Sequence, residues 1–97
     1  MTRKVNIALQ ILPRGEKTEV YSLVDKAIEV IQRSGVTYRV CPFETVMEGE
    51  YDKLMEVVKE AQEACFSAGA EDMMVYVKIQ RSRDNDVTID DKMKKYE

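Results

Sequence analysis

A cluster of carboxylate and hydroxyl side chains, the stretch FETVMEGEYD at residues 43–52, precedes a long amphipathic segment. Glu44, Glu48 and Glu50 could bind a cation, and the hydroxyl of Thr45 could donate or accept a hydrogen bond. Acidic residues at the start of a helix also stabilise its positive N-terminal end, by about 0.3–1 kcal/mol each. The acids are therefore either helix-start residues or, where a strand places them on a buried side, groups that reach a rim, an interface or a cationic ligand.

Other kinds of chemistry have little support in the sequence. The chain contains no histidine, which removes the commonest general base and metal ligand. Two or three glutamates without an aspartate-rich loop are weak evidence for a metal site, and no phosphate-binding glycine-rich loop or serine-nucleophile motif occurs. Cys41 lacks a histidine that could activate it as a nucleophile. We therefore expect no enzyme activity, no catalytic residue, no metal and no cofactor.

The basic residues Lys78, Arg81 and Arg83 follow one another closely near the end of a predicted strand. They could hold a phosphate or a carboxylate of a neighbouring subunit. The alternative, which we favour, is a solvated strand end whose charge is balanced by Asp84 and Asp86.

Composition narrows the class of partner and the compartment. The 97 residues include 15 basic and 18 acidic side chains, a balance that gives no general field to attract nucleic acid or an anionic membrane. No apolar run reaches membrane-spanning length, and the first ten residues have too short an apolar core for a signal peptide. Cys41 and Cys65 lack CxxC spacing and suit buried free thiols in a reducing compartment. We expect a cytoplasmic protein with a single domain over residues 1–97.

The elements that must position these side chains follow the order βαββαβ. Alternating apolar residues predict strands over residues 5–12, 36–41, about 44–48 and about 72–80, with PRG at residues 13–15 ending the first. Apolar residues at three- and four-residue steps predict helices over residues 20–31 and 51–68 and a short C-terminal helix after Thr88. Thr18 is the expected N-cap of the first helix, and Gly35 and Gly69 are expected to end the two long helices.

This order predicts an α+β fold, a ferredoxin-like βαββαβ sandwich with a short C-terminal helix. Both long helices then cover one face of an antiparallel four-stranded sheet. We expect right-handed crossovers to place strands one and four in the centre of the sheet.

The opposite face of the predicted sheet has no helix to cover it. The aliphatic residues of the first and fourth strands, Ile79 among them, are expected under the helices. Strand alternation then assigns to the uncovered face Ala8, Gln10, Leu12, Arg39, Cys41, Phe43, Thr45, Met47, Met74, Tyr76, Lys78 and Gln80. It sends Glu48 to the helix-covered side. A face with this many large apolar side chains needs a partner, and we expect two or more subunits to bury it together; the alternative is that the C-terminal helix folds back over it.

Four segments of the chain resemble, in order, the small thiamine-binding protein family. They are LQILPRG at residues 9–15, ETVMEGEYDKLMEVVKEA at 44–61, AGAEDMMVYVKIQRSRD at 68–84 and TIDDK at 88–92. Thr-x-x-Glu-Gly-Glu before the second long helix is the most specific of these elements. The resemblance implies a cytoplasmic ferredoxin-like homodimer or homotetramer, associated through its sheets, that binds thiamine or its hydroxymethylpyrimidine moiety without transforming it.

The resemblance also implies a ligand site at a subunit interface. Its expected residues are Thr45, Glu48, Gln10, Phe43, Met47 and Tyr76. In this interpretation Thr45 hydrogen-bonds the ligand, Glu48 supplies a carboxylate for the cationic thiazolium, and the aromatic residues and Met47 form walls. Gln10 stands where such proteins often have a small hydroxyl residue, and Arg14 where an apolar one is common. The alternative is an oligomeric interaction or regulatory protein without a small-molecule ligand.

Overall fold

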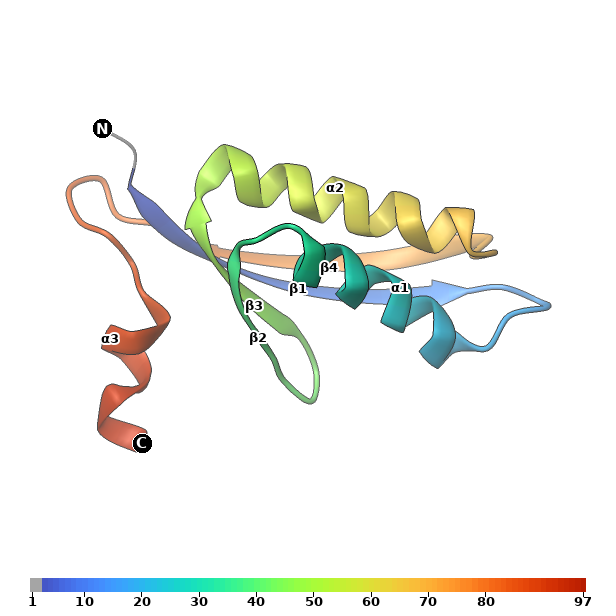
Figure 1. The fold of residues 1–97 in the computed structure, drawn as a ribbon, viewed down its shortest axis with the longest axis horizontal. Helices are drawn as coiled ribbons and strands as arrows, with labels where there is room; N and C mark the ends of the chain where they lie inside the picture. Colours follow the sequence, from blue (N-terminus) through green and yellow to red (C-terminus); the bar gives the residue numbers. More distant parts are fainter. Residues whose placement is uncertain (1–2) are drawn as a thin grey trace.

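The computed structural model describes residues 3–97 and has the predicted ferredoxin-like α+β architecture (Figure 1). The elements are β1 (Lys4–Arg14), α1 (Val20–Arg33), β2 (Thr37–Val40), β3 (Thr45–Glu50), α2 (Tyr51–Ser67), β4 (Asp72–Gln80), α3 (Ile89–Met93) and the 3₁₀ helix η1 (Lys94–Tyr96).

The four strands form one antiparallel sheet in the order β2-β3-β1-β4. The prediction that strands one and four are central is wrong for β4, which pairs only with β1 in the described part of the chain. Each crossover helix carries the chain past one strand of the other βαβ unit, so β1 and β3 lie in the centre and β2 and β4 at the edges.

The hydrophobic core lies between the sheet and the two long helices. Residues from β1, β3, α1 and α2 that form it are Val5, Ile7, Leu9, Ile11, Met47, Leu23, Ala27, Ile31, Leu54, Val57, Val58, Ala61 and Cys65. The predicted helix-covered side of β1 is therefore confirmed. On β4 the side chains are less buried, and Ile79 remains 42% exposed because β4 is an edge strand.

Among the differences between predicted and observed element boundaries, two concern a residue with an expected structural role. Pro13 does not stop β1, since it pairs with Met73 in a stretch where β1 has no partner strand on its β3 side, and proline is tolerated at a sheet edge. The N-cap of α1 is Glu19, one residue after the predicted Thr18. Both long helices end as expected, with positive φ angles of 83° at Gly35 and 120° at Gly69.

The hairpin between β2 and β3 reverses the predicted orientation of β3. Val40 lies opposite Thr45, and a four-residue loop closed by a hydrogen bond from Cys41 N to Glu44 O (2.9 Å) connects them. Residues directly opposite in an antiparallel pair share a face, so Thr45 shares the face of Val40 and not that of Arg39.

As a consequence, the predicted orientations of three site residues are wrong. Thr45 and Met47 are 6% and 0% exposed and lie on the helix-covered side, opposite Leu9 and Ile7 of β1. Glu48, which alternation sent to the helix-covered side, lies on the other face.

After β4 the chain crosses to the side of the sheet away from α1 and α2, and α3 lies at the lower left in Figure 1. The crossing is held by hydrogen bonds from Lys4 N to the Asp86 carboxylate (2.8 Å) and from Val87 N to Lys4 O (2.9 Å). Thr88 caps α3 as predicted, because its hydroxyl accepts a hydrogen bond from Asp91 N at 3.1 Å. No residue of α3 or η1 is buried.

Candidate functional site

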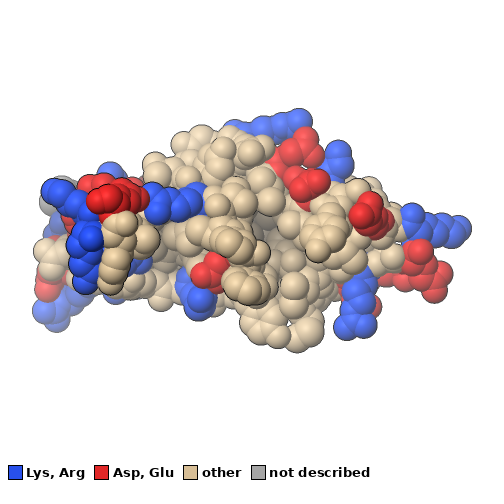
Figure 2. All heavy atoms as spheres, turned by 90° about the horizontal axis from the view of Figure 1, so that it is seen from below, with Lys and Arg blue, Asp and Glu red and all other residues tan. Residues whose placement is uncertain are grey.

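We call the sheet face away from α1 and α2 the open face. Its residues are Asn6, Ala8, Gln10, Leu12, Thr37, Arg39, Glu44, Val46, Glu48, Met74, Tyr76, Lys78 and Gln80. Figure 2 views the molecule from the side on which α3 lies in Figure 1: uncharged atoms fill the middle of the view, and charged side chains gather mainly at its two ends. The open face thus combines polar and charged side chains with a smaller apolar set, Ala8, Leu12, Val46, Met74 and Tyr76.

The C-terminal segment covers one end of the open face and holds Glu48. The Glu48 carboxylate oxygen Oε1 accepts a hydrogen bond from Ile89 N at 2.6 Å. Asn6 lies directly opposite Glu48 across β1 and β3, and its Nδ2 donates to Val87 O at 3.1 Å. Since both contacts go to backbone atoms of the segment, this end of the face is a polar junction and not an apolar contact.

A cavity of about 280 Å³, which we call the polar hollow, lies beside this junction. It is lined by Asn6, Ala8, Glu44, Val46, Lys78, Ile79, Gln80 and Lys92. Lys78 forms an ion pair with Glu44 at 3.1 Å, and Lys92 of α3 donates to the Gln80 side-chain oxygen at 2.8 Å. The hollow therefore presents a carboxylate, two ammonium groups and two amides around a small apolar floor of Ala8 and Val46.

A second cavity of about 420 Å³, the apolar hollow, lies at the edge of β1 beyond its pairing with β3, between β1, α1 and the hairpin loop. Gln10, Leu12, Val20, Tyr21, Val24, Pro42 and Phe43 line it. Tyr76 lies directly opposite Gln10 on β4 and is 49% exposed, while Phe43 in the hairpin loop is 81% exposed. Tyr76 and Phe43 therefore place exposed aromatic rings near Gln10.

The structure does not bring the six predicted ligand residues together in one chain. Gln10, Phe43 and Tyr76 lie at or near the apolar hollow, and Glu48 lies under the C-terminal segment. Gln10 is four residues along β1 from Asn6, the partner of Glu48, which corresponds to about 13 Å at the usual rise of a strand. Thr45 and Met47 face the core behind both.

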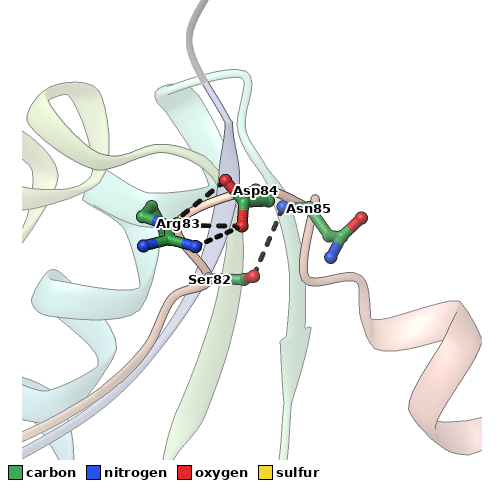
Figure 3. A network of polar contacts seen from close by, with 4 residues as sticks. All are labelled: Ser82, Arg83, Asp84 and Asn85. Carbon is green, nitrogen blue, oxygen red and sulfur yellow. Dashed lines mark hydrogen bonds and ion pairs between the residues drawn. The ribbon is translucent and has the colours of Figure 1, made fainter.

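The three basic residues near the end of β4 do not come together in one place. Arg81 and Arg83 line a cavity of about 620 Å³ with Arg3, Glu50 and Asp52, and Lys78 is not part of it. Lys78 turns to Glu44, and the guanidinium of Arg81 lies 4.3 Å from the centre of the Tyr51 ring. Arg83 turns to the neighbouring Asp84, with two of its nitrogens within 3.3 Å of the carboxylate (Figure 3). The arrangement agrees with a solvated strand end better than with a phosphate site.

The two cysteines are free thiols in different surroundings. Cys65 is buried beneath α1, with its Sγ 3.3 Å from Leu23 O, and burial raises the pKa of its thiol. Cys41 is only half-buried in the hairpin loop. Within residues 3–97 no group of three or more cysteine, aspartate or glutamate side chains is arranged to hold a metal ion. No helix in the same range is long and apolar enough to cross a membrane.

Comparison with known proteins shows the family to which this chain belongs. The profile of a family described as "Thiamine-binding protein" matches residues 7–97, and the chain belongs to that family. A UPF0045 protein of Clostridium perfringens is 46% identical over 91 residues, which are 94% of this chain and 95% of the relative. A UPF0045 protein of Methanothermobacter thermautotrophicus is 34% identical over 91 residues, 92% of each chain.

Two solved structures share the fold of this chain. A domain of unknown function, DUF77, from Bacillus cereus has a TM-score of 0.97 and 47% identity, and the match covers 100% of this chain and 93% of that one. A Thermotoga maritima protein, provisionally described as a thiamine biosynthesis/salvage protein, has a TM-score of 0.87 and 30% identity, covering 97% and 99% of the two chains. The predicted family membership is therefore confirmed.

Asn6, Glu44 and Lys92 border the polar hollow but were not among the predicted ligand residues. Asn6 had a signal in the sequence, because it alternates with Val5 and Ile7 and so falls on the face away from the core. Glu44 lies on the open face for the same reason as Glu48, the hairpin register. Lys92 had no such signal, since its place depends on how the C-terminal segment crosses the sheet.

Proposed function

We propose that this protein is a non-enzymatic, cytoplasmic binding protein for thiamine or its hydroxymethylpyrimidine moiety, and that the ligand lies on the open face. Family membership over residues 7–97 supports the ligand class. The observation that supports the ligand's location is the position of the Glu48 carboxylate. The β2–β3 register places it on the open face, directly opposite Asn6.

The open face has the groups that such a ligand needs. A cationic thiazolium is stabilised by a carboxylate, and Glu48 provides one. An aminopyrimidine needs hydrogen-bonding groups along its edge, and the polar hollow provides the amides of Asn6 and Gln80, of which Asn6 lies directly opposite Glu48. Tyr76 and Phe43 are exposed aromatic rings that can form walls. None of these groups forms a nucleophile with an adjacent general base, which fits binding without chemical change.

We also place the ligand between subunits of a homodimer or homotetramer. Leu12, Met74 and Tyr76 are 44%, 52% and 49% exposed on the part of the open face that the C-terminal segment leaves uncovered. Contiguous apolar surface of this kind favours association with a second copy of the chain. A second copy would also explain why the carboxylate and the aromatic walls lie far apart in one chain.

A second candidate, an oligomeric interaction protein without a ligand, has one observation in its favour. Glu48 already accepts a hydrogen bond from Ile89 N, so its carboxylate has a structural task in the free chain. In that case the apolar part of the open face would be filled by another subunit alone.

Calorimetric titration with thiamine, its phosphates and hydroxymethylpyrimidine tests the proposal, and Glu48→Gln distinguishes the two candidates. Glutamine keeps an oxygen that can accept from Ile89 N but removes the charge. Loss of a charge-assisted interaction worth about 1.5–3 kcal/mol should weaken thiamine binding by about 10- to 100-fold. Glu63→Gln, on the exposed side of α2, is the matched control and should bind as the wild type does. Absence of heat with every one of these ligands would contradict the proposal, and an effect of Glu48→Gln on assembly alone would favour the second candidate.

A further inference from the structure

The side-chain oxygen of Asn6, Oδ1, lacks a hydrogen-bond partner among the residues that the structure describes. Its side chain is 3% exposed, and within residues 3–97 its Oδ1 is the one buried side-chain oxygen or nitrogen without a hydrogen-bond partner. Leaving a buried acceptor unsatisfied is costly, so such atoms are rare and each calls for an explanation.

The orientation of the Asn6 amide is fixed by its other contact. Nδ2 donates to the carbonyl oxygen of Val87 at 3.1 Å, and a carbonyl oxygen can only accept. Turning the amide over would place Oδ1 against that carbonyl and lose the hydrogen bond. The unpartnered atom is therefore an acceptor, and the group that completes it must be a donor.

Asn6 stands in the middle of the polar end of the open face. Glu48 lies directly opposite it on β3 and Gln80 directly opposite it on β4. Side chains opposite one another in an antiparallel sheet have Cβ atoms about 4.5–5.5 Å apart, so a ring at Asn6 and a cationic ring at Glu48 could be joined by a single methylene bridge.

The size of the polar hollow sets what can lie there. Its volume of about 280 Å³ is just below the range of about 300–1,000 Å³ typical of pockets for whole drug-sized ligands. The hollow therefore suits one small heterocycle, and the remainder of a two-ring ligand would extend outside it.

We propose that the polar hollow is the subsite for the pyrimidine ring and that Asn6 Oδ1 accepts a hydrogen bond from the exocyclic amine of that ring. This inference rests on the proposed function. It adds that the protein recognises an amino group, and not an oxo group, on the pyrimidine. A ligand with an oxo group at that position would place its oxygen, an acceptor, against the acceptor Asn6 Oδ1. The hydrogen bond from Asn6 Nδ2 to Val87 O prevents the amide from turning over to offer a donor.

Binding in this way involves the C-terminal segment. Asn6 Oδ1 has almost no exposed surface in the free chain, and the backbone of Val87 lies against the same amide. Val87 stays in place through the hydrogen bond from its N to Lys4 O at 2.9 Å, so it is the segment at residues 88–92 that must shift to let the amine reach the oxygen. Its contacts to the sheet are polar and its helix has no buried residue, which makes such a shift inexpensive.

A comparison of thiamine with oxythiamine, in which an oxygen replaces the exocyclic amine, tests the inference on the unaltered protein. Calorimetric titration should show thiamine binding about 10- to 100-fold more tightly than oxythiamine, because a buried acceptor facing an acceptor is left unpaired. The same preference is expected between hydroxymethylpyrimidine and its 4-oxo analogue. Equal affinity for the two members of each pair would overturn the inference and leave the proposed function standing. Failure of all four compounds to bind would overturn both.

Asn6→Ala provides a second measurement that uses the same ligands. Without the acceptor, thiamine and oxythiamine should bind with affinities within about threefold of each other, whereas Gln32→Ala, an exposed amide on α1, should keep the full preference. An Asn6→Ala protein that folds and still prefers thiamine would contradict the assignment. If this variant does not fold, as judged by circular dichroism, the comparison on the wild-type protein decides.

Discussion

The expected role of Glu48 can be predicted from the sequence, but the side of the sheet on which it lies depends on the fold. Its expected role as a ligand group follows from the resemblance to a family and stays a prediction, while strand alternation alone predicts the wrong side of the sheet. The error came from carrying alternation from Arg39 through the hairpin to Thr45. The loop has four residues and places Val40 opposite Thr45. Odd-numbered residues of β2 therefore lie on the open face, whereas odd-numbered residues of β3 lie on the core side.

The two thiols give a prediction at the same scale. The thiolate is the reactive form, and burial keeps the pKa of Cys65 above its ordinary value of 9.0, so at pH 8 Cys65 should react with iodoacetamide at least tenfold more slowly than Cys41. Mass spectrometry of the labelled peptides measures both rates, and in denaturant they should converge. Equal rates in the folded protein would contradict the burial of Cys65.

The same shift has a consequence for stability. A thiol whose pKa is raised in the folded state contributes stability that is fully present below its unfolded value of 9.0 and is lost as pH rises through the folded value. The Cys65 term in the free energy of unfolding should therefore decline only above about pH 9.

At the scale of the elements, type and order were predictable from the sequence. The periods of two and of three to four residues located every strand and helix of β1 to α3, and Gly35, Gly69 and Thr88 marked ends that the structure has. Order within the sheet and register were not predictable in the same way. They depend on which strand each crossover passes and on the length of the hairpin loop, neither of which leaves a periodic signal.

A contact between two loops explains a glycine whose role the sequence does not reveal. A Cβ added at Gly15 would lie 2.5 Å from the backbone oxygen of Gly69, so the loop after β1 can approach the end of α2 only without a side chain there. Since the atom in the way is backbone, it cannot turn aside.

Gly15→Ala should therefore lower the free energy of unfolding by about 1–3 kcal/mol, because the two loops must separate. Gly49→Ala is the matched control: its Cβ would meet Leu54 Cδ2 at 3.5 Å, an ordinary contact, and the change should stay within about 0.5 kcal/mol. Urea unfolding curves measure both. Equal midpoints for the two variants would show that the approach of Gly15 to Gly69 is not a tight contact in solution.

At the scale of the whole molecule, the open face is divided into two parts. The C-terminal segment covers the end with Asn6 and Glu48 through polar contacts, and the end with Leu12, Met74 and Tyr76 stays exposed. The interpretation of a folded-back C-terminal segment is thus right for one part of the face, and the expectation that a second subunit covers the other part stays a prediction. The sequence could not divide it, because the path of residues 86–97 depends on contacts between side chains and backbone across the sheet.

The central claim is that subunits join through the open face and hold a thiamine-type ligand there, and native mass spectrometry with thiamine tests it most directly. The account predicts a dimer or tetramer that retains thiamine. Met74→Lys should lose both association and ligand, because it places a charge in the apolar part of the face, whereas Phe66→Lys, a similarly exposed site on α2, should keep both. A monomer that retains no thiamine at micromolar concentration would contradict the account.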